Sequence, residues 1–198
     1  MKKETEHDPQ SGDWQDLSTW SQAPRYAAIA EMITKHCGTC GMVLDVGCGT
    51  AELLSHSPFV DYTGIEPSYH AANIAKTRSG RVLIHCTNAA DFNAPLRYDC
   101  VVFNESLYYC EDPLAMLEKY SRLQKPDGMM IVSIFQKPSA YWLVRLARRL
   151  LGKKNINTNI TTTRIVDVWM RERLKKVRMT LVKIPGCELV WNIWTGVS

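Results

Sequence analysis

The sequence predicts an α/β domain with a doubly wound, mostly parallel sheet and an antiparallel hairpin at its C-terminal end. Three observations lead to this fold class. Runs of β-forming residues alternate with helical segments over residues 24–135, which is typical of parallel strands joined by crossover helices. Two further β-forming runs within residues 177–197 flank a Pro-Gly turn. The length of 198 residues, 45% of them hydrophobic, suits one domain with a sizeable core.

The expected elements follow one another along the chain. Pro24 suits the first turn of a helix, and Asp112 followed by Pro113 is a typical helix start. The pattern predicts helices over 24–35, from about 50, over 68–77 and over 112–123, and strands over 42–46, 60–65, 81–85, 99–103 and 129–135. We expect residues 1–23 to form a flexible N-terminal segment or lid, and residues 24–198 to form a single domain.

Charge is distributed unevenly along a chain whose formal net charge is +4. Residues 1–136 hold 11 Lys and Arg against 17 Asp and Glu, whereas residues 137–198 hold 13 against 3. An amphipathic helix is predicted within residues 139–154, with Arg145, Arg148 and Arg149 on one face, and a flexible connector over 153–164. This asymmetry predicts an anionic partner for the basic part.

The cysteines and the N-terminal residues bear on the compartment. Seven cysteines, an odd number, in a chain without an export signal predict free thiols. Cys37 and Cys40 form one close pair with no second pair at a matching distance, so we expect no metal site. The first residues lack a hydrophobic export core, and no apolar run reaches membrane-spanning length. A cytoplasmic location is therefore expected.

A glycine turn follows the first predicted strand, in LDVGCGTAELL at residues 44–54. Gly47 and Gly49 allow the backbone and a helix N-terminus to approach a ligand closely. A Walker phosphate loop needs a lysine after its second glycine, and a dinucleotide fingerprint needs a third glycine where Glu52 stands. The residues of this turn therefore disfavour both a nucleoside triphosphate and a dinucleotide as its ligand.

The segment from Asp45 to Ala51 resembles the first motif of class I S-adenosylmethionine-dependent methyltransferases, of the small-molecule type. Four later stretches resemble further motifs of this family in the same order: GIEPS, CTNAADF, YDCVVFNESLYYCEDP and LQKPDGMMIVSI. The resemblance covers roughly residues 24–135. It implies the seven-stranded, Rossmann-like methyltransferase fold and S-adenosylmethionine as the cofactor.

The resemblance also implies cofactor contacts. Gly47, Cys48 and Gly49 would bring the backbone close to the cofactor, and Asp45 would hold an ammonium group or an ordered water. Glu66 would accept from both ribose hydroxyls, and it stands 19 residues after Gly47, near the distance expected for an acid in a nucleotide-binding βαβ unit.

The third motif departs from the family pattern. The family usually carries an acid that accepts from the adenine amino group, followed by a small residue with a free N–H. Here Asn88 and Ala89 occupy these positions. An Asn carbonyl oxygen accepts the same bond without charge. Asp91 is the alternative adenine contact, and an ordinary turn residue is the other interpretation of Asn88.

The reacting end of the site follows the fourth predicted strand. By resemblance, Asn104 and Glu105 would face the methyl group, and Glu105 is the nearest candidate carboxylate for a catalytic base. The family often uses this region only to position the cofactor. Tyr26 matches a family position that closes over the cofactor, and Arg25 beside it suits the cofactor's carboxylate.

The resemblance implies a small-molecule acceptor methylated on oxygen or nitrogen, such as a sugar, a lipid-linked glycan or a natural product. We expect residues 136–163 to be a basic insertion on the acceptor side, meeting an anionic acceptor or the inner, anionic face of a membrane. Nucleic acid is disfavoured because no recognised module accompanies the basic cluster. The alternatives are a nicotinamide-dependent oxidoreductase and a non-catalytic nucleotide-binding protein on the same fold.

Overall fold

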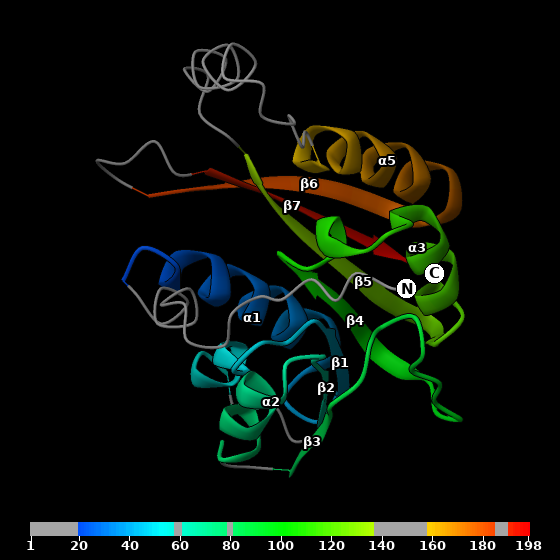
Figure 1. The fold of residues 1–198 in the computed structure, drawn as a ribbon. Helices are drawn as coiled ribbons and strands as arrows, with labels where there is room; N and C mark the ends of the chain where they lie inside the picture. The colour runs from blue at the N-terminus through cyan, green and yellow to red at the C-terminus, as the bar shows by residue number, and fades with distance from the viewer. Residues whose placement is uncertain (1–19, 58–60, 79–80, 137–157, 185–189) are drawn as a thin grey trace, which may run out of the picture.

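A computed structural model describes residues 20–57, 61–78, 81–136, 158–184 and 190–198. Seven strands form one sheet in the order β3-β2-β1-β4-β5-β7-β6 (Figure 1). The strands are β1 (Met42–Val46), β2 (Asp61–Ile65), β3 (Arg81–His85), β4 (Tyr98–Asn104), β5 (Gln124–Gln136), β6 (Lys175–Lys183) and β7 (Val190–Val197). Strands β1 to β5 pair in parallel, and β7 pairs antiparallel with both β5 and β6. The predicted fold class is confirmed.

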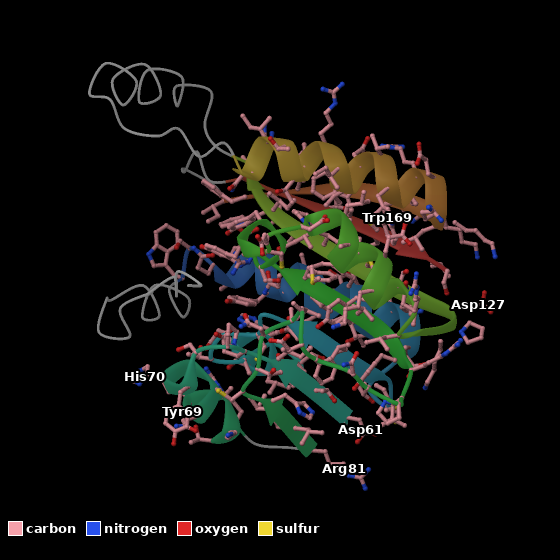
Figure 2. The ribbon with its side chains drawn as sticks, turned by 45° about the vertical axis from the view of Figure 1, so that its right-hand side comes forward. Asp61, Tyr69, His70, Arg81, Asp127 and Trp169 are labelled. Carbon is pink, nitrogen blue, oxygen red and sulfur yellow. The ribbon has the colours of Figure 1, made fainter. Side chains whose placement is uncertain are left out.

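Helices pack on both faces of the sheet (Figure 1). One face carries α1 (Ala23–Cys37), the 3-10 turn η3 (Glu52–Ser55) and α2 (Tyr69–Lys76). The other carries the 3-10 turn η4 (Leu107–Tyr109), α3 (Pro113–Ser121) and α5 (Thr158–Arg173). Trp169 lies between α5 and α3 (Figure 2), and its indole N–H donates to the Glu118 carboxylate at 2.9 Å. Because both faces are covered, β1 and β4 are buried along most of their length.

Side-chain caps begin two of the predicted helices. The Ser68 hydroxyl accepts from the N–H of Ala71 at the start of α2, and the Asp112 carboxylate accepts from the N–H of Ala115 at the start of α3. Pro113 occupies the first turn of α3, where a missing N–H costs nothing. These local signals explain why both helices begin where the sequence predicts.

The strand order reverses at β1, and this reversal selects one edge of the sheet for ligands. The chain runs outward from β1 to β2 and β3, then returns to place β4 on the other side of β1. In open α/β sheets, ligands bind beyond the carboxyl ends of the strands at such a point. Figure 2 shows the two edges: Asp61 and Arg81, at the amino ends of β2 and β3, lie on the opposite side from Tyr69 and His70 of α2.

The helix expected from about residue 50 is wrong, because only the single 3-10 turn η3 forms there. Ala51, immediately before it, has a φ of +55°, in the left-handed region that interrupts a right-handed helix. The glycine turn therefore leads into a tight loop.

The flexible connector expected over residues 153–164 is wrong from residue 158 onward, where α5 begins. Four threonines near its start have low intrinsic helix propensity. Burial of Val166, Trp169 and Met170 against the sheet outweighs that preference. The predicted amphipathic helix with Arg145, Arg148 and Arg149 lies outside the described residues. Within the described part, no helix is long and apolar enough to cross a membrane.

Candidate active site

The glycine turn leaves β1 at the carboxyl edge of the sheet. Gly47 and Gly49 have φ angles of +75° and +56°, which favour glycine. A Cβ atom on Gly47 would lie 2.5 Å from the Cβ of Ser106, so the loop after β4 approaches this turn closely. The N–H groups of Gly47 and Cys48 donate to the carbonyl of Ile65 at 2.8 and 3.0 Å. The turn is therefore held against the end of β2.

Glu66 directly follows β2, and its carboxylate joins the glycine turn to α2. Its side chain is buried, and one oxygen accepts from the N–H of Gly49 at 2.9 Å. The other oxygen accepts from the N–H of Ser68 at 2.8 Å. Each carboxylate oxygen can accept more than one hydrogen bond. The arrangement thus fixes the carboxylate while leaving acceptor capacity for a ligand.

Asp45 is a buried carboxyl group on β1. Its Oδ2 accepts from the Tyr62 hydroxyl at 2.7 Å, whereas its Oδ1 is buried with no hydrogen-bond partner among the described residues. Burial raises the pKa of Asp45 to about 7; the charge of Glu66 adds to this rise, and the bond from Tyr62 opposes it. A buried acceptor without a partner is uncommon in native proteins and marks a place for a ligand or a water.

Arg25 brings the start of α1 to the same edge. Its buried guanidinium lies 4.7 Å from the ring centre of Tyr26 and 5.4 Å from that of Trp191 on β7. One nitrogen lies 4.0 Å from a carboxylate oxygen of Glu105, and Nε has no partner among the described residues. The Tyr26 ring stacks on His56, with ring centres 5.5 Å apart. Contacts among this guanidinium and these three rings therefore bring together α1, the residue after η3 and β7.

Glu105 follows β4 with a φ of +60°, which is uncommon for a residue with a side chain. Its side chain is 13% exposed and accepts from the Tyr108 hydroxyl at 3.0 Å. The Ser133 hydroxyl lies 3.4 Å from Glu105 and 2.9 Å from the side-chain oxygen of Asn104. Burial raises the pKa of Glu105 to about 7, against the opposing effects of Arg25 and these hydroxyls. A carboxyl group in this state exchanges a proton near neutral pH.

Asn88 and Ala89 lie in the loop after β3. The carbonyl of Asn88 accepts from the N–H groups of Asp91 and Phe92, each at 3.1 Å, which closes a turn. The side chains of Asn88 and Asp91 are exposed, and the carbonyl of Ala89 accepts from two side chains of α3. This loop stands three strands along the sheet from Glu105.

The structure brings the other predicted residues together at one edge. Gly49 contacts Glu66, Arg25 faces Glu105, and Asp45 lies within electrostatic reach of Arg25 and Glu66. No comparison tests their roles, so these roles stay predictions. In the part of the chain that the structure describes, no group of three His, Cys, Asp or Glu side chains is placed to hold a metal ion.

Sequence reasoning missed three partners of the site: Tyr62, Ser133 and Trp191. All three are interior strand residues, and they reach the site only because β2, β5 and β7 lie in one sheet. Ser133 is the polar residue in the otherwise apolar run MMIVSIF, and that interruption is a signal the sequence offers. Tyr62 and Trp191 have no comparable signal.

Comparison with known proteins identifies the family. Residues 20–177 match a protein family described as the methyltransferase domain. The chain belongs to this family. The predicted family is therefore confirmed.

Curated relatives of this methyltransferase domain are a little over a quarter identical to it over the residues that align. It is 28% identical over 135 residues to a ubiquinone biosynthesis O-methyltransferase of Neisseria meningitidis, covering 62% of this chain and 57% of that protein. It is 29% identical over 111 residues to the Yersinia enterocolitica protein of the same name, covering 52% and 46%. The chain spans about half the length of these curated relatives.

Solved methyltransferase structures share the fold. The N-methyltransferase NodS from Bradyrhizobium japonicum superposes with a TM-score of 0.66 at 16% identity, covering 92% of this chain and 98% of NodS. The plantazolicin methyltransferase BpumL in complex with S-adenosylhomocysteine gives 0.65 at 14% identity, covering 95% and 88%. S-adenosylhomocysteine is the product of S-adenosylmethionine after methyl transfer. The cofactor predicted from the sequence motifs, S-adenosylmethionine, is consistent with this bound product.

Proposed function

We propose that this domain transfers a methyl group from S-adenosylmethionine to an oxygen or nitrogen atom of a small molecule, with Glu105 as the base. The family and the product bound in BpumL support the methyl donor. The observation that carries the role of Glu105 is a carboxyl group only 13% exposed, facing Arg25 and Tyr108 at the carboxyl end of β4, with a pKa of about 7. Acceptors consistent with this chemistry include sugars, lipid-linked glycans and natural products.

Two buried polar atoms that have no partner within the described residues fit the amino-acid end of the donor. That end carries an ammonium and a carboxylate, and the site offers one orphan acceptor, Oδ1 of Asp45, and one orphan donor, Nε of Arg25. We assign the ammonium to Asp45, the carboxylate to Arg25, the ribose to Glu66 and the adenine to Asn88 with Ala89. When bound, the sulfonium supplies an electrophilic methyl carbon.

Glu105 would accept the proton that a hydroxyl or ammonium acceptor loses on methylation. A base with a pKa near the working pH is populated in the proton-accepting form and still binds the proton usefully. Tyr108 and Ser133 orient its two oxygens, and Arg25 stabilises the ionised form. Asn104, joined to Glu105 through Ser133, would orient the reacting groups.

The test uses S-adenosylmethionine with a labelled methyl group and a small-molecule extract of the source organism. Label should appear in a discrete product. We expect Glu105→Gln to lower the rate by about 10²- to 10⁴-fold, since general base catalysis has this size. Its calorimetric affinity for S-adenosylhomocysteine should stay within about threefold of the wild type. Glu31→Gln, an exposed acid of α1, is the control. A fully active Glu105→Gln would remove Glu105 as the base.

The cofactor assignment has a separate test. Thermal unfolding should be measured in parallel with S-adenosylmethionine, NAD and ATP, because a ligand that binds the folded state raises its stability. We expect a higher midpoint with S-adenosylmethionine alone. A shift with NAD alone would favour an oxidoreductase instead.

We also propose that the C-terminal part meets an anionic acceptor or an anionic membrane surface. Residues 158–184 hold seven Lys and Arg against two Asp and Glu. On β6, Met179 and Leu181, which are 46% and 48% exposed, alternate with their neighbours along the strand and share one face with the exposed Lys183. Cationic and apolar side chains on one surface suit an anionic interface.

Co-sedimentation with anionic and neutral liposomes at low and high salt tests the membrane version. We expect binding that needs anionic lipid, weakens at high salt, and falls when Arg145, Arg148 and Arg149 are changed together to Gln. A protein that stays in the supernatant with both lipids at low salt would leave only the anionic acceptor.

A further inference from the structure

The geometry points to Lys119 and Tyr120 of α3 as positioning residues for recognition of the adenine ring. They hold the loop after β3, on which Asn88 and Ala89 are the proposed adenine contacts. The inference therefore rests on that part of the proposed function. It adds two residues of α3, which bind the carbonyl groups of Ala89 and Ala90.

Three hydrogen bonds join α3 to the loop. The Tyr120 hydroxyl donates to the carbonyl of Ala89 at 2.9 Å. The Lys119 ammonium donates to the carbonyls of Ala89 and Ala90 at 3.1 and 2.7 Å. Hydrogen bonds from a charged donor are stronger than neutral ones. The Tyr120 ring is fully buried and lies edge-on to Phe103, with ring centres 5.4 Å apart, so the core fixes its hydroxyl.

Other contacts hold the loop in place on the side of β3. Phe92 is buried, and its ring lies edge-on to that of His85, with centres 5.0 Å apart. The N–H groups of Asp91 and Phe92 both donate to the carbonyl of Asn88. The loop is thus held by β3 at Phe92 and by α3 at Ala89 and Ala90.

Peptide planarity converts these carbonyl contacts into directions for the N–H groups. In a trans peptide, the carbonyl of one residue and the N–H of the next point in opposite directions. The carbonyl of Asn88 points into the turn, so the N–H of Ala89 points out of it. The carbonyl of Ala89 points to α3, so the N–H of Ala90 points away from α3. The turn at Asn88 thus directs the N–H of Ala89, whereas Lys119 and Tyr120 hold the carbonyl of Ala89 and direct the N–H of Ala90.

If these residues were merely structural, their substitution would weaken the binding of every ligand alike. If they position the loop, their substitution should change the preference for one base over another. Adenine presents an amino donor and a ring nitrogen acceptor on the edge that this loop would read. On the same edge, hypoxanthine presents an oxo acceptor in place of the amino donor. It also presents a ring N–H donor in place of the ring nitrogen acceptor. S-adenosylhomocysteine and its hypoxanthine analogue, S-inosylhomocysteine, therefore differ only in the feature that the loop would recognise.

The experiment measures the affinities of both compounds by calorimetry for the wild type, Lys119→Met, Tyr120→Phe and the double variant. Ser121→Ala is the matched control, since its hydroxyl donates within α3 to the carbonyl of Glu118. We expect the wild type and the control to prefer S-adenosylhomocysteine. In the double variant, this preference should fall by about 3- to 10-fold, as expected for misplacing one or two hydrogen bonds.

Equal weakening of both compounds would overturn the positioning role. A wild type without preference would overturn the adenine assignment of Asn88 and Ala89, and the inference with it. A wild type that binds neither compound would instead contradict the proposed cofactor. If the double variant does not fold, the ratio of the two affinities is measured for Tyr120→Phe instead. This variant keeps the buried ring and removes only the hydroxyl.

Discussion

Charged side chains are buried at the carboxyl edge of β1, β2 and β4. They are exposed at the outer edge formed by α5 and β6. At the first edge, Asp45 and Arg25 are 1% and 3% exposed, and each keeps one polar atom without a partner among the described residues. At the second, the Arg171–Asp167 pair has side chains that are 59% and 40% exposed. The first edge withdraws charge from water, and the second leaves it solvated.

This difference separates two kinds of electrostatic effect. A buried charge lacks the stabilisation that water provides, so single interactions there shift a pKa and select a ligand. A solvated charge is screened, so single pairs contribute little and only their sum attracts an anionic partner. Substitutions at the two edges should therefore differ in size and in dependence on pH.

The largest effect should come from removing the buried carboxyl group of Asp45. Its pKa is about 7 in the folded chain and about 4 in the unfolded chain. Below pH 4 both states hold the proton. Between pH 4 and 7 only the folded state keeps it, so the free energy of unfolding falls as pH rises. Asp45→Asn should escape this fall and gain up to about 4 kcal/mol on the wild type by pH 8.

Urea unfolding of the ligand-free protein at several pH values between 4 and 8 measures this gain. Glu31→Gln, an exposed acid, should keep the pH profile of the wild type. Parallel profiles for Asp45→Asn and the wild type would show that burial does not perturb Asp45.

Glu66→Ala should produce the next largest effect, on cofactor affinity. Hydrogen bonds to a charged acceptor contribute roughly 1.5–3 kcal/mol each. Loss of the proposed ribose contacts should weaken binding of S-adenosylmethionine by about 10-fold to more than 100-fold. Calorimetry on the folded variant is the measurement, and an unchanged affinity would remove Glu66 from the site.

Substitutions of Asn88 should have smaller effects that differ in sign. If its side-chain oxygen accepts from the adenine amino group, Asn88→Asp should keep or strengthen binding, because a carboxylate is the stronger acceptor. Asn88→Leu should weaken binding by about 2- to 10-fold. The opposite order in a calorimetric titration would move the adenine contact elsewhere, with Asp91 as the first candidate.

The smallest effect is expected at the outer edge. Arg171→Ala removes one exposed ion pair on the surface of α5, where solvent screens the charges. The thermal midpoint should be unchanged within error at low and at high salt. A clear loss of stability would show that this edge depends on single charges as the site does.

Local chain chemistry explains most of what could be predicted about the fold. The alternation of strands and helices, the caps at Ser68 and Asp112 and the glycine turn act within a few residues, so one sequence displays them. The helix α5 was missed because its threonines disfavour a helix locally, and the gain from burying Trp169 and Met170 depends on strands far away in the chain.

The turn of the backbone at Gly47 and Gly49 and the acid that follows β2 could be predicted from the order of residues, because they depend on conformations and spacings along the chain. The bond from Tyr62 to Asp45, the contact of Trp191 with Arg25 and the place of Glu105 between Tyr108 and Ser133 arise only in the folded molecule. Burial and hydrogen-bond partners depend on groups brought together from distant segments. These two properties set the pKa values of Asp45 and Glu105, and with them the chemistry available at the site.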